Sequence, residues 1–142
     1  MKKAMVVVGV VLALVVAVSL IPLTNNLCAC VQLSHMRRTP LPAQTVCEDG
    51  LWKVGRFVGT GDGTQYFTAI LVRSERSVFE LREWYEPYGY KVKPQWGQQV
   101  DVLERSPVLR FEHEKDDDAT YFIVYRLKDG IPPFAWLDVR GC

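Results

Sequence analysis

The sequence lacks a surplus of either charge. It holds 17 lysines and arginines against 16 aspartates and glutamates, for a formal net charge of +1. Without Lys2 and Lys3 of the N-terminal segment, 15 of the 17 basic residues remain against the 16 acidic ones. A nucleic-acid-binding surface needs a clear basic excess, and so does a polybasic patch that attracts anionic lipids. We therefore expect no nucleic-acid partner.

Motifs for binding phosphate or calcium are also missing. The glycine-rich residues 59–63 are followed by Thr64 and Gln65, whereas a phosphate-binding loop continues with Lys and Ser or Thr into a helix. Residues 116–118 are three consecutive aspartates, but calcium loops alternate their oxygen ligands and include a glycine bend. Both segments are predicted to be turns, and no cofactor is expected.

Histidine is scarce, and His113 is the only one within the predicted folded domain. Its neighbours Glu112 and Glu114 alternate with it along a predicted strand and so point to the opposite face. Neither carboxylate can then orient His113 as a general base. A packed histidine is the preferred interpretation, and a hydrolase built on His113 is the alternative.

Charge is absent from Ala4 to Leu23, where valine, leucine and alanine predominate. A helix of this length rises roughly 30 Å, about the thickness of the hydrocarbon core of a bilayer. The length favours an uncleaved signal-anchor. The small residues of the triplet 17–19 leave a cleaved signal peptide as the alternative.

The positions of the basic residues predict the orientation of the anchor. Lys2 and Lys3 directly precede the apolar segment, and the next cations are Arg37 and Arg38. The positive-inside rule then keeps the N-terminus in the cytoplasm. The rest of the chain is expected outside the cytoplasm, as a domain of the cell envelope.

A lipidation site is a further alternative at the end of this segment. Leu27, Cys28, Ala29 and Cys30 resemble the bacterial lipobox, which places Leu three residues before an acylated Cys. The resemblance implies that Cys30 becomes the lipidated N-terminus. The sequence departs from the pattern in having Cys at the second position and polar residues 24–26 before the box.

Cysteine is limited to four residues, all beyond the apolar segment. Outside the cytoplasm thiols are usually paired, and we predict a disulfide between Cys47 and Cys142. In the chain-entropy model, closing so long a loop stabilises the fold by at most about 4–5 kcal/mol. The alternative is a metal site that uses Cys28 and Cys30, although their spacing is shorter than zinc sites usually have.

The chain is expected to divide into a membrane or signal segment (1–23), a tether (24–45) and one α+β domain (46–142). The tether is predicted from prolines and the lack of sustained periodicity. In the domain, Ser77 and Glu80 form a capping box that begins the single predicted helix, and Pro87 and Gly89 end it. Strands are predicted at 52–58, 66–73, 99–105, 108–115, 120–127 and 134–140; the short piece 90–92 is not counted.

This order, β-β-α-β-β-β-β, predicts a mostly antiparallel sheet because the connections are short. One helix cannot cover both faces, so we expect the sheet to curl or half-close into a barrel. The alternative is an open sheet with the helix packed across one face.

Aromatic residues are concentrated around the predicted helix. We predict that they either pack the helix on the sheet or form an exposed surface that binds a protein or a glycan. The function expected is therefore binding by a membrane-tethered domain; the alternative is a small exported hydrolase or metal-handling protein using His113 or Cys28 and Cys30. The aromatic residues are Trp84, Tyr85, Tyr88, Tyr90 and Trp96.

Overall fold

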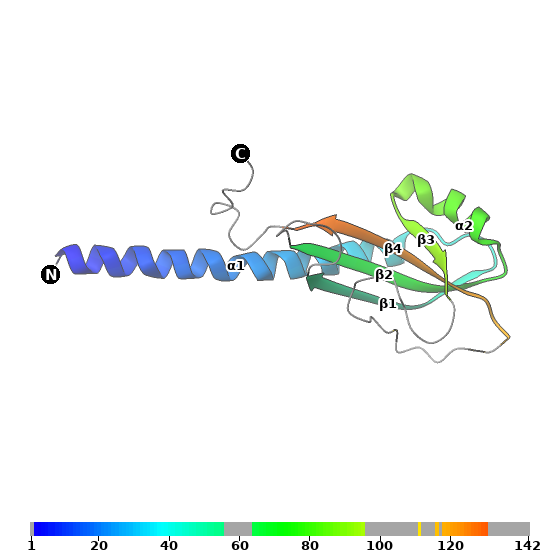
Figure 1. The fold of residues 1–142 in the computed structure, drawn as a ribbon, viewed down its shortest axis with the longest axis horizontal. Coiled ribbons are helices and arrows are strands. Elements are labelled where there is room, and N and C mark those ends of the chain that lie inside the picture. The colour runs from blue at the N-terminus through cyan, green and yellow to red at the C-terminus, as the bar shows by residue number, and fades with distance from the viewer. Residues whose placement is uncertain (1, 56–63, 96–110, 112–115, 117, 131–142) are drawn as a thin grey trace.

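A computed structural model of the chain describes residues 2–55, 64–95, 111, 116 and 118–130. A long helix precedes four strands, and a short helix lies between the second and third strands (Figure 1). The elements are α1 (Lys2–Arg38), β1 (Thr45–Gly55), β2 (Gln65–Ser74), α2 (Val78–Tyr85), the 3-10 turn η1 (Glu86–Tyr88), β3 (Lys91–Pro94) and β4 (Tyr121–Asp129).

The strands form one antiparallel sheet in the order β1-β2-β4-β3. β2 lies inside the sheet, and residues 67–72 are buried on both faces, as its run of apolar residues predicted. The register of β1 shifts between Cys47 and Asp49, where Glu48 forms a bulge. The predicted α+β class, with a curled antiparallel sheet and a helix, is confirmed.

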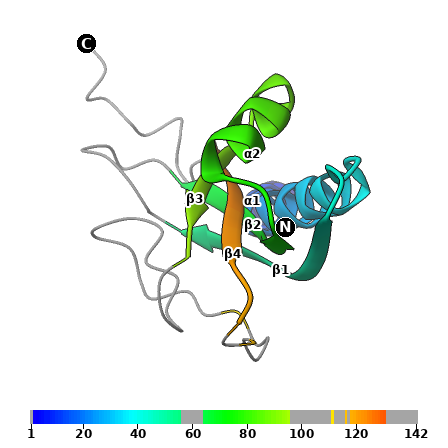
Figure 2. The ribbon, with the colours of Figure 1, turned by 90° about the vertical axis from the view of Figure 1, so that its right-hand side faces the viewer.

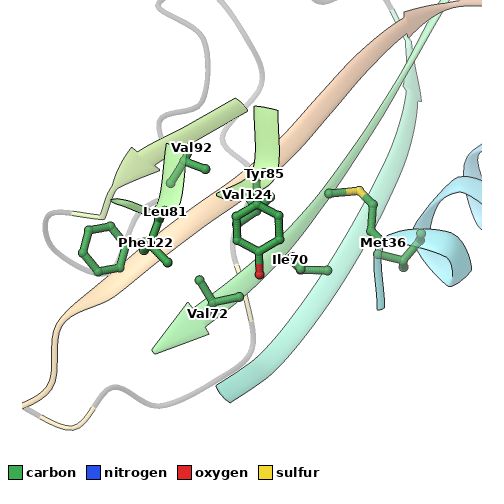
Figure 3. Close-up of a cluster of buried hydrophobic side chains, with 9 residues drawn as sticks. Met36, Ile70, Val72, Leu81, Tyr85, Val92, Phe122 and Val124 are labelled. Atoms are coloured by element: carbon green, nitrogen blue, oxygen red, sulfur yellow. The ribbon is translucent and has the colours of Figure 1, made fainter. Parts of the chain in front are cut away.

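The two faces of the sheet carry separate hydrophobic clusters. Phe111 packs on one face, whose central residues are Phe67, Ala69, Leu71, Tyr121 and Ile123. The other face is covered by both helices, which lie on the same side of the sheet in Figure 2. Its buried side chains are Leu33, Met36, Ile70, Val72, Leu81, Tyr85, Val92, Phe122 and Val124, most of which Figure 3 shows.

The second half of α1 belongs to the domain. Helical structure continues to Arg38, where the sequence analysis expected an irregular tether over residues 24–45. The residues of this half that are buried recur on one helical face, and Gln32 donates a hydrogen bond from Nε2 to Thr68 Oγ1 on β2. Because this face mixes polar and small residues with apolar ones, its periodicity is weak in the sequence. The buried residues are Asn25, Ala29, Gln32, Leu33 and Met36.

The start of α2 follows from its local sequence. Glu80 N donates to Ser77 Oγ at 3.3 Å, and Ser77 N donates to the Glu80 carboxylate at 2.9 Å. The predicted capping box is therefore confirmed. Leu81 and Tyr85 then face the sheet, and Gly89 ends η1 with a left-handed φ of 71°, which glycine adopts without strain.

Several predicted strands differ from the structure or lie outside the described residues. β1 begins at Thr45, ahead of the predicted start at residue 52. β3 is a strand paired to β4, whereas the sequence predicts no counted strand at 90–92. At the predicted aspartate turn, Ala119 N donates to Asp116 O at 3.2 Å. The predicted strands 99–105 and 134–140, and all of 108–115 except Phe111, lie outside the described residues.

Candidate functional site

The aromatic residues around α2 occupy different environments. Tyr85 is fully buried, and its ring lies over β2 near Ile70 and Val72 in Figure 3. It is part of the core and contributes nothing to a surface. Trp84 and Tyr88 are exposed, Tyr90 is half-buried, and Trp96 lies outside the described residues. The expected binding surface is thus reduced to the side chains that flank the buried tyrosine.

Tyr88, Tyr90 and Arg126 form a layered arrangement that we call the tyrosine–arginine stack. The rings of Tyr88 and Tyr90 lie 6.2 Å apart with an interplanar angle of 16°. The Arg126 guanidinium carbon lies 5.9 Å from the centre of the Tyr90 ring. Tyr88 is 42% exposed, so an aromatic ring meets solvent at the outer end of the stack.

The stack is positioned by the turn that follows α2. Gly89 N donates to Glu86 O at 2.8 Å, and Tyr90 N donates to Tyr85 O at 3.3 Å. These bonds and the left-handed backbone of Gly89 reverse the direction of the chain after η1. The side chains of Tyr88 and Tyr90 therefore lie next to each other, with their rings stacked. Arg126 belongs to β4, which pairs antiparallel with β3, and its guanidinium lies against Gly89.

The chemistry of the stack suits a polar ligand with a flat apolar face. An arginine over an aromatic ring is held by about 0.5–2 kcal/mol and keeps its planar donors available. Arg126 forms no ion pair with the described residues. Aromatic rings and arginine are the residue types that contribute most to binding surfaces.

Trp84 forms a second contact between α2 and the segment after α1. Its indole Nε1 donates to Pro40 O at 3.0 Å. This bond satisfies the polar atom of the ring while the ring stays partly exposed, and Leu41 next to Pro40 is also exposed. Trp84 therefore links α2 by a hydrogen bond to the connection between α1 and β1. It is not part of the tyrosine–arginine stack.

Cys47 lies half-buried on β1 near the buried phenol of Tyr85. Burial raises the pKa of the Cys47 thiol, and nearby Arg37 only partly offsets this. Burial raises the pKa of Tyr85 as well, and the charge of Cys47 adds to that shift. Both groups are therefore neutral at neutral pH, which makes Cys47 a poor nucleophile. Its predicted partner Cys142 lies outside the described residues, so the disulfide stays a prediction.

Cys28 and Cys30 are exposed on α1. Two residues apart on a helix, their side chains point about 200° apart, so they cannot hold one ion together. Across the described ranges, no group of three His, Cys, Asp or Glu side chains could bind a metal. His113, the residue of the hydrolase alternative, lies outside these ranges.

Helix α1 provides the remaining functional feature. It is long and apolar enough to cross a membrane, and the apolar part is not buried by the rest of the chain. An apolar N-terminal helix of this kind fits membrane association. Two features of the structure were not predicted from the sequence: the core role of residues 25–36, and the position of Arg126 opposite Tyr90. Only the pairing of β3 with β4 brings Arg126 to that ring.

The chain matches no family model, and no curated protein or solved structure matches it.

Proposed function

We propose that this protein is a single-pass, membrane-anchored binding domain that uses the tyrosine–arginine stack to hold a protein or glycan outside the cytoplasm. The observation that carries the proposal is that one helix, α1, contains the apolar membrane-length segment and also packs on the sheet. Leu23, at the end of the apolar segment, is exposed, whereas Asn25, two residues later, is buried against the sheet domain. A continuous helix leaves no free linker between membrane and domain.

The dual role of α1 favours an uncleaved anchor. Processing before Cys30 would remove Asn25 and Ala29, which are 3% and 0% exposed in the domain. Such a cut would leave a short helix on the sheet and uncover part of the core. Cleavage after Ser19 would spare the core but would release a helix with a strongly apolar outer side. In our proposal, therefore, Cys30 is not lipidated and α1 remains whole.

The proposed orientation follows from the basic residues of the sequence. Lys2 and Lys3 stay in the cytoplasm, and the domain is held on the far side. In that compartment the predicted bridge between Cys47 and Cys142 would be stable. The bridge would tie the end of the chain to β1, close to the face that α1 covers.

The proposed ligand surface is the exposed end of the stack. A sugar ring or the side chains of an extended peptide could lie on the Tyr88 ring and receive hydrogen bonds from Arg126. Loss of one such aromatic or cation contact costs about 1–2 kcal/mol. Binding should then fall by roughly 5- to 30-fold.

The test compares two stack variants with a matched control. Full-length Tyr88→Ala and Arg126→Gln proteins in detergent are sedimented with purified cell-wall glycan, beside Phe79→Ala. Phe79 is 73% exposed on α2 but outside the stack. We expect both stack variants to lose binding and Phe79→Ala to retain it.

A protein partner is tested by a photo-reactive amino acid at position 88 in cells. A protein ligand predicts a defined adduct that disappears when Arg126 is also changed to Gln, with no glycan binding. The proposal is wrong if wild-type protein neither sediments with glycan nor forms such an Arg126-dependent adduct.

A further inference from the structure

Beyond the membrane segment, α1 has two opposite faces. One is buried on the sheet. On the other, Leu20, Leu27 and Val31 are 52%, 62% and 46% exposed. Their spacings of seven and four residues place them on one side of a helix with 3.6 residues per turn. We call these three residues the outer stripe.

The outer stripe continues the apolar surface of the membrane segment, interrupted on that side by Thr24, whose hydroxyl donates to Leu20 O at 2.8 Å within the helix. No Asp, Glu, Lys or Arg occurs from Ala4 to Met36. A helix face in water normally carries charged and polar side chains opposite the buried face. Arg38, seven residues beyond Val31, follows on the same side and is exposed. It forms no ion pair with the part of the chain that the structure describes, so its charge remains available for an anionic group.

The apolar surface of α1 therefore ends at different heights on its two sides. Toward the sheet, Ile21 is the last apolar residue before the buried Asn25 one turn later, whereas on the outer side apolar residues continue to Val31. Ten residues of helix rise roughly 15 Å. A helix perpendicular to the bilayer would meet the water at one height all round, which this asymmetry contradicts.

A tilted helix accounts for the difference. A tilt of about 40°, the upper end of the usual range, lowers one side of a helix about 10 Å wide by roughly 8 Å. At this tilt the charge-free residues 4–23 span roughly 23 Å along the bilayer normal, and local thinning of the bilayer makes up the difference. This is the rise of about five or six residues, enough to bring Leu27 to the level of Ile21. Val31 then lies in the headgroup layer, which is about 5–8 Å thick on each side of the bilayer.

We infer that α1 crosses the bilayer tilted toward its outer stripe, so that Leu27 and Val31 contact the outer leaflet and Arg38 meets lipid phosphates. The occupant of this face is the phospholipid bilayer itself. Two observations identify it: the stripe extends the membrane-crossing surface, and the positive charge of Arg38 complements the phosphates. A long arginine side chain can extend back to that level. The sheet then lies on the side of α1 that faces away from the bilayer. This inference rests on the membrane-anchored state proposed above.

The test measures the depth of single spin labels on full-length protein in vesicles of phosphatidylcholine and phosphatidylglycerol. In a background in which Cys28, Cys30 and Cys142 are replaced by Ser and Cys47 by Ala, one nitroxide is placed at Leu27→Cys or Val31→Cys. Controls are Val11→Cys inside the membrane segment and Phe79→Cys on α2. Collision with oxygen reports lipid, and collision with a water-soluble nickel chelate reports water. We expect nickel accessibility at positions 27 and 31 to be several-fold lower than at position 79, approaching that at position 11.

Each result is decisive. Water-like values at positions 27 and 31 with a lipid-like value at position 11 would overturn the tilt but leave the anchor intact. A water-like value at position 11 would overturn the anchor itself. Spin–spin broadening at position 31 that disappears when labelled protein is diluted with unlabelled protein would show that a second copy covers the stripe, and this also overturns the inference.

The role of Arg38 has its own readout. Arg38→Gln should raise nickel accessibility at position 31, and more so in vesicles with phosphatidylglycerol. Lys91→Gln, which removes an exposed cation from β3, should leave it unchanged. An equal effect of the two substitutions would contradict the contact between Arg38 and phosphate.

Discussion

The two halves of α1 share one helical backbone but have opposite surroundings. Residues 5–23 are almost uniformly apolar and exposed, whereas the half from Asn25 to Met36 buries one face on the sheet. The first half can be recognised from composition alone because it is apolar on every side and is not buried by the rest of the described chain. The second half mixes asparagine, glutamine and cysteine with leucine and methionine, and only the sheet explains why it is helical. Helical structure in the two halves thus has different causes.

Shortening α1 from its N-terminal end should have the largest effect on the stability of the fold. A chain that begins at residue 24 keeps every buried residue of the second half and should fold. A chain that begins at residue 31 loses Asn25 and Ala29 from the core, and we expect it to show no cooperative unfolding. Thermal melts followed by circular dichroism distinguish the two. If both chains melt alike, the second half of α1 is a tether after all.

A matched pair of substitutions compares the two faces of the second half. Met36→Ala removes a fully buried side chain and should lower the free energy of unfolding by about 2–5 kcal/mol. Val31→Ala, on the outer stripe, should change it by no more than about 0.5 kcal/mol. Urea unfolding of the chain that begins at residue 24 measures both. Equal losses would show that the two faces are equally buried.

The polar contact of α1 with the sheet should contribute less. Gln32→Ala removes the hydrogen bond from α1 to the fully buried Thr68 hydroxyl, which still donates to Arg126 O at 3.5 Å, so the loss should be about 0.5–1.5 kcal/mol. Asn26→Ala is the control, since Asn26 is exposed on the same helix, and it should be nearly neutral. The prediction fails if the two variants unfold at the same urea concentration.

α2 provides a helix whose start depends on local sequence rather than on a partner. Ser77→Ala removes the cap and should cost about 1 kcal/mol. The Ser77 backbone N–H and, to a smaller extent, the Ser77 hydroxyl donate to the Glu80 carboxylate and lower its pKa below the usual 4.5, and Ser77→Ala removes only the hydroxyl contribution. A carboxylate with a lowered folded pKa stabilises the fold above its unfolded pKa, and this is lost as pH falls through the folded value. The unfolding midpoint of wild type should therefore drop more than that of Ser77→Ala as the solution is acidified below about pH 4.5.

The smallest effect concerns thiol reactivity. In reduced, detergent-solubilised protein, Cys47 should be alkylated more slowly than Cys28 and Cys30 because burial raises its pKa and the other two are exposed. Mass spectrometry after timed iodoacetamide treatment gives the order. Faster labelling of Cys47 would mean that the thiol is activated, which would favour a chemical role for it.

Local sequence signals accounted for α2, β2 and most of β4. The capping box of Ser77 and Glu80, the doubly apolar run of β2 and the alternation before Asp129 each depend on neighbours within a few residues. β3 and the first part of β1 were not recognised because their stability comes from pairing with β4 and β2. The candidate site shows the same limit: the aromatic cluster was visible, but neither the burial of Tyr85 nor the approach of Arg126 could be read from spacing.

The amino-acid sequence was enough to recognise the apolar N-terminal helix and the antiparallel α+β class, because the hydropathy of a segment and the alternation of a strand are local properties. Only the tertiary structure decided that residues 25–36 are core, that Tyr85 faces inward and that Arg126 covers Tyr90. Each of these depends on contact between segments far apart in the chain. The free energy of such a contact comes from burial and hydrogen bonding with a partner far away in the sequence. It therefore cannot be inferred from the residues on either side in the chain.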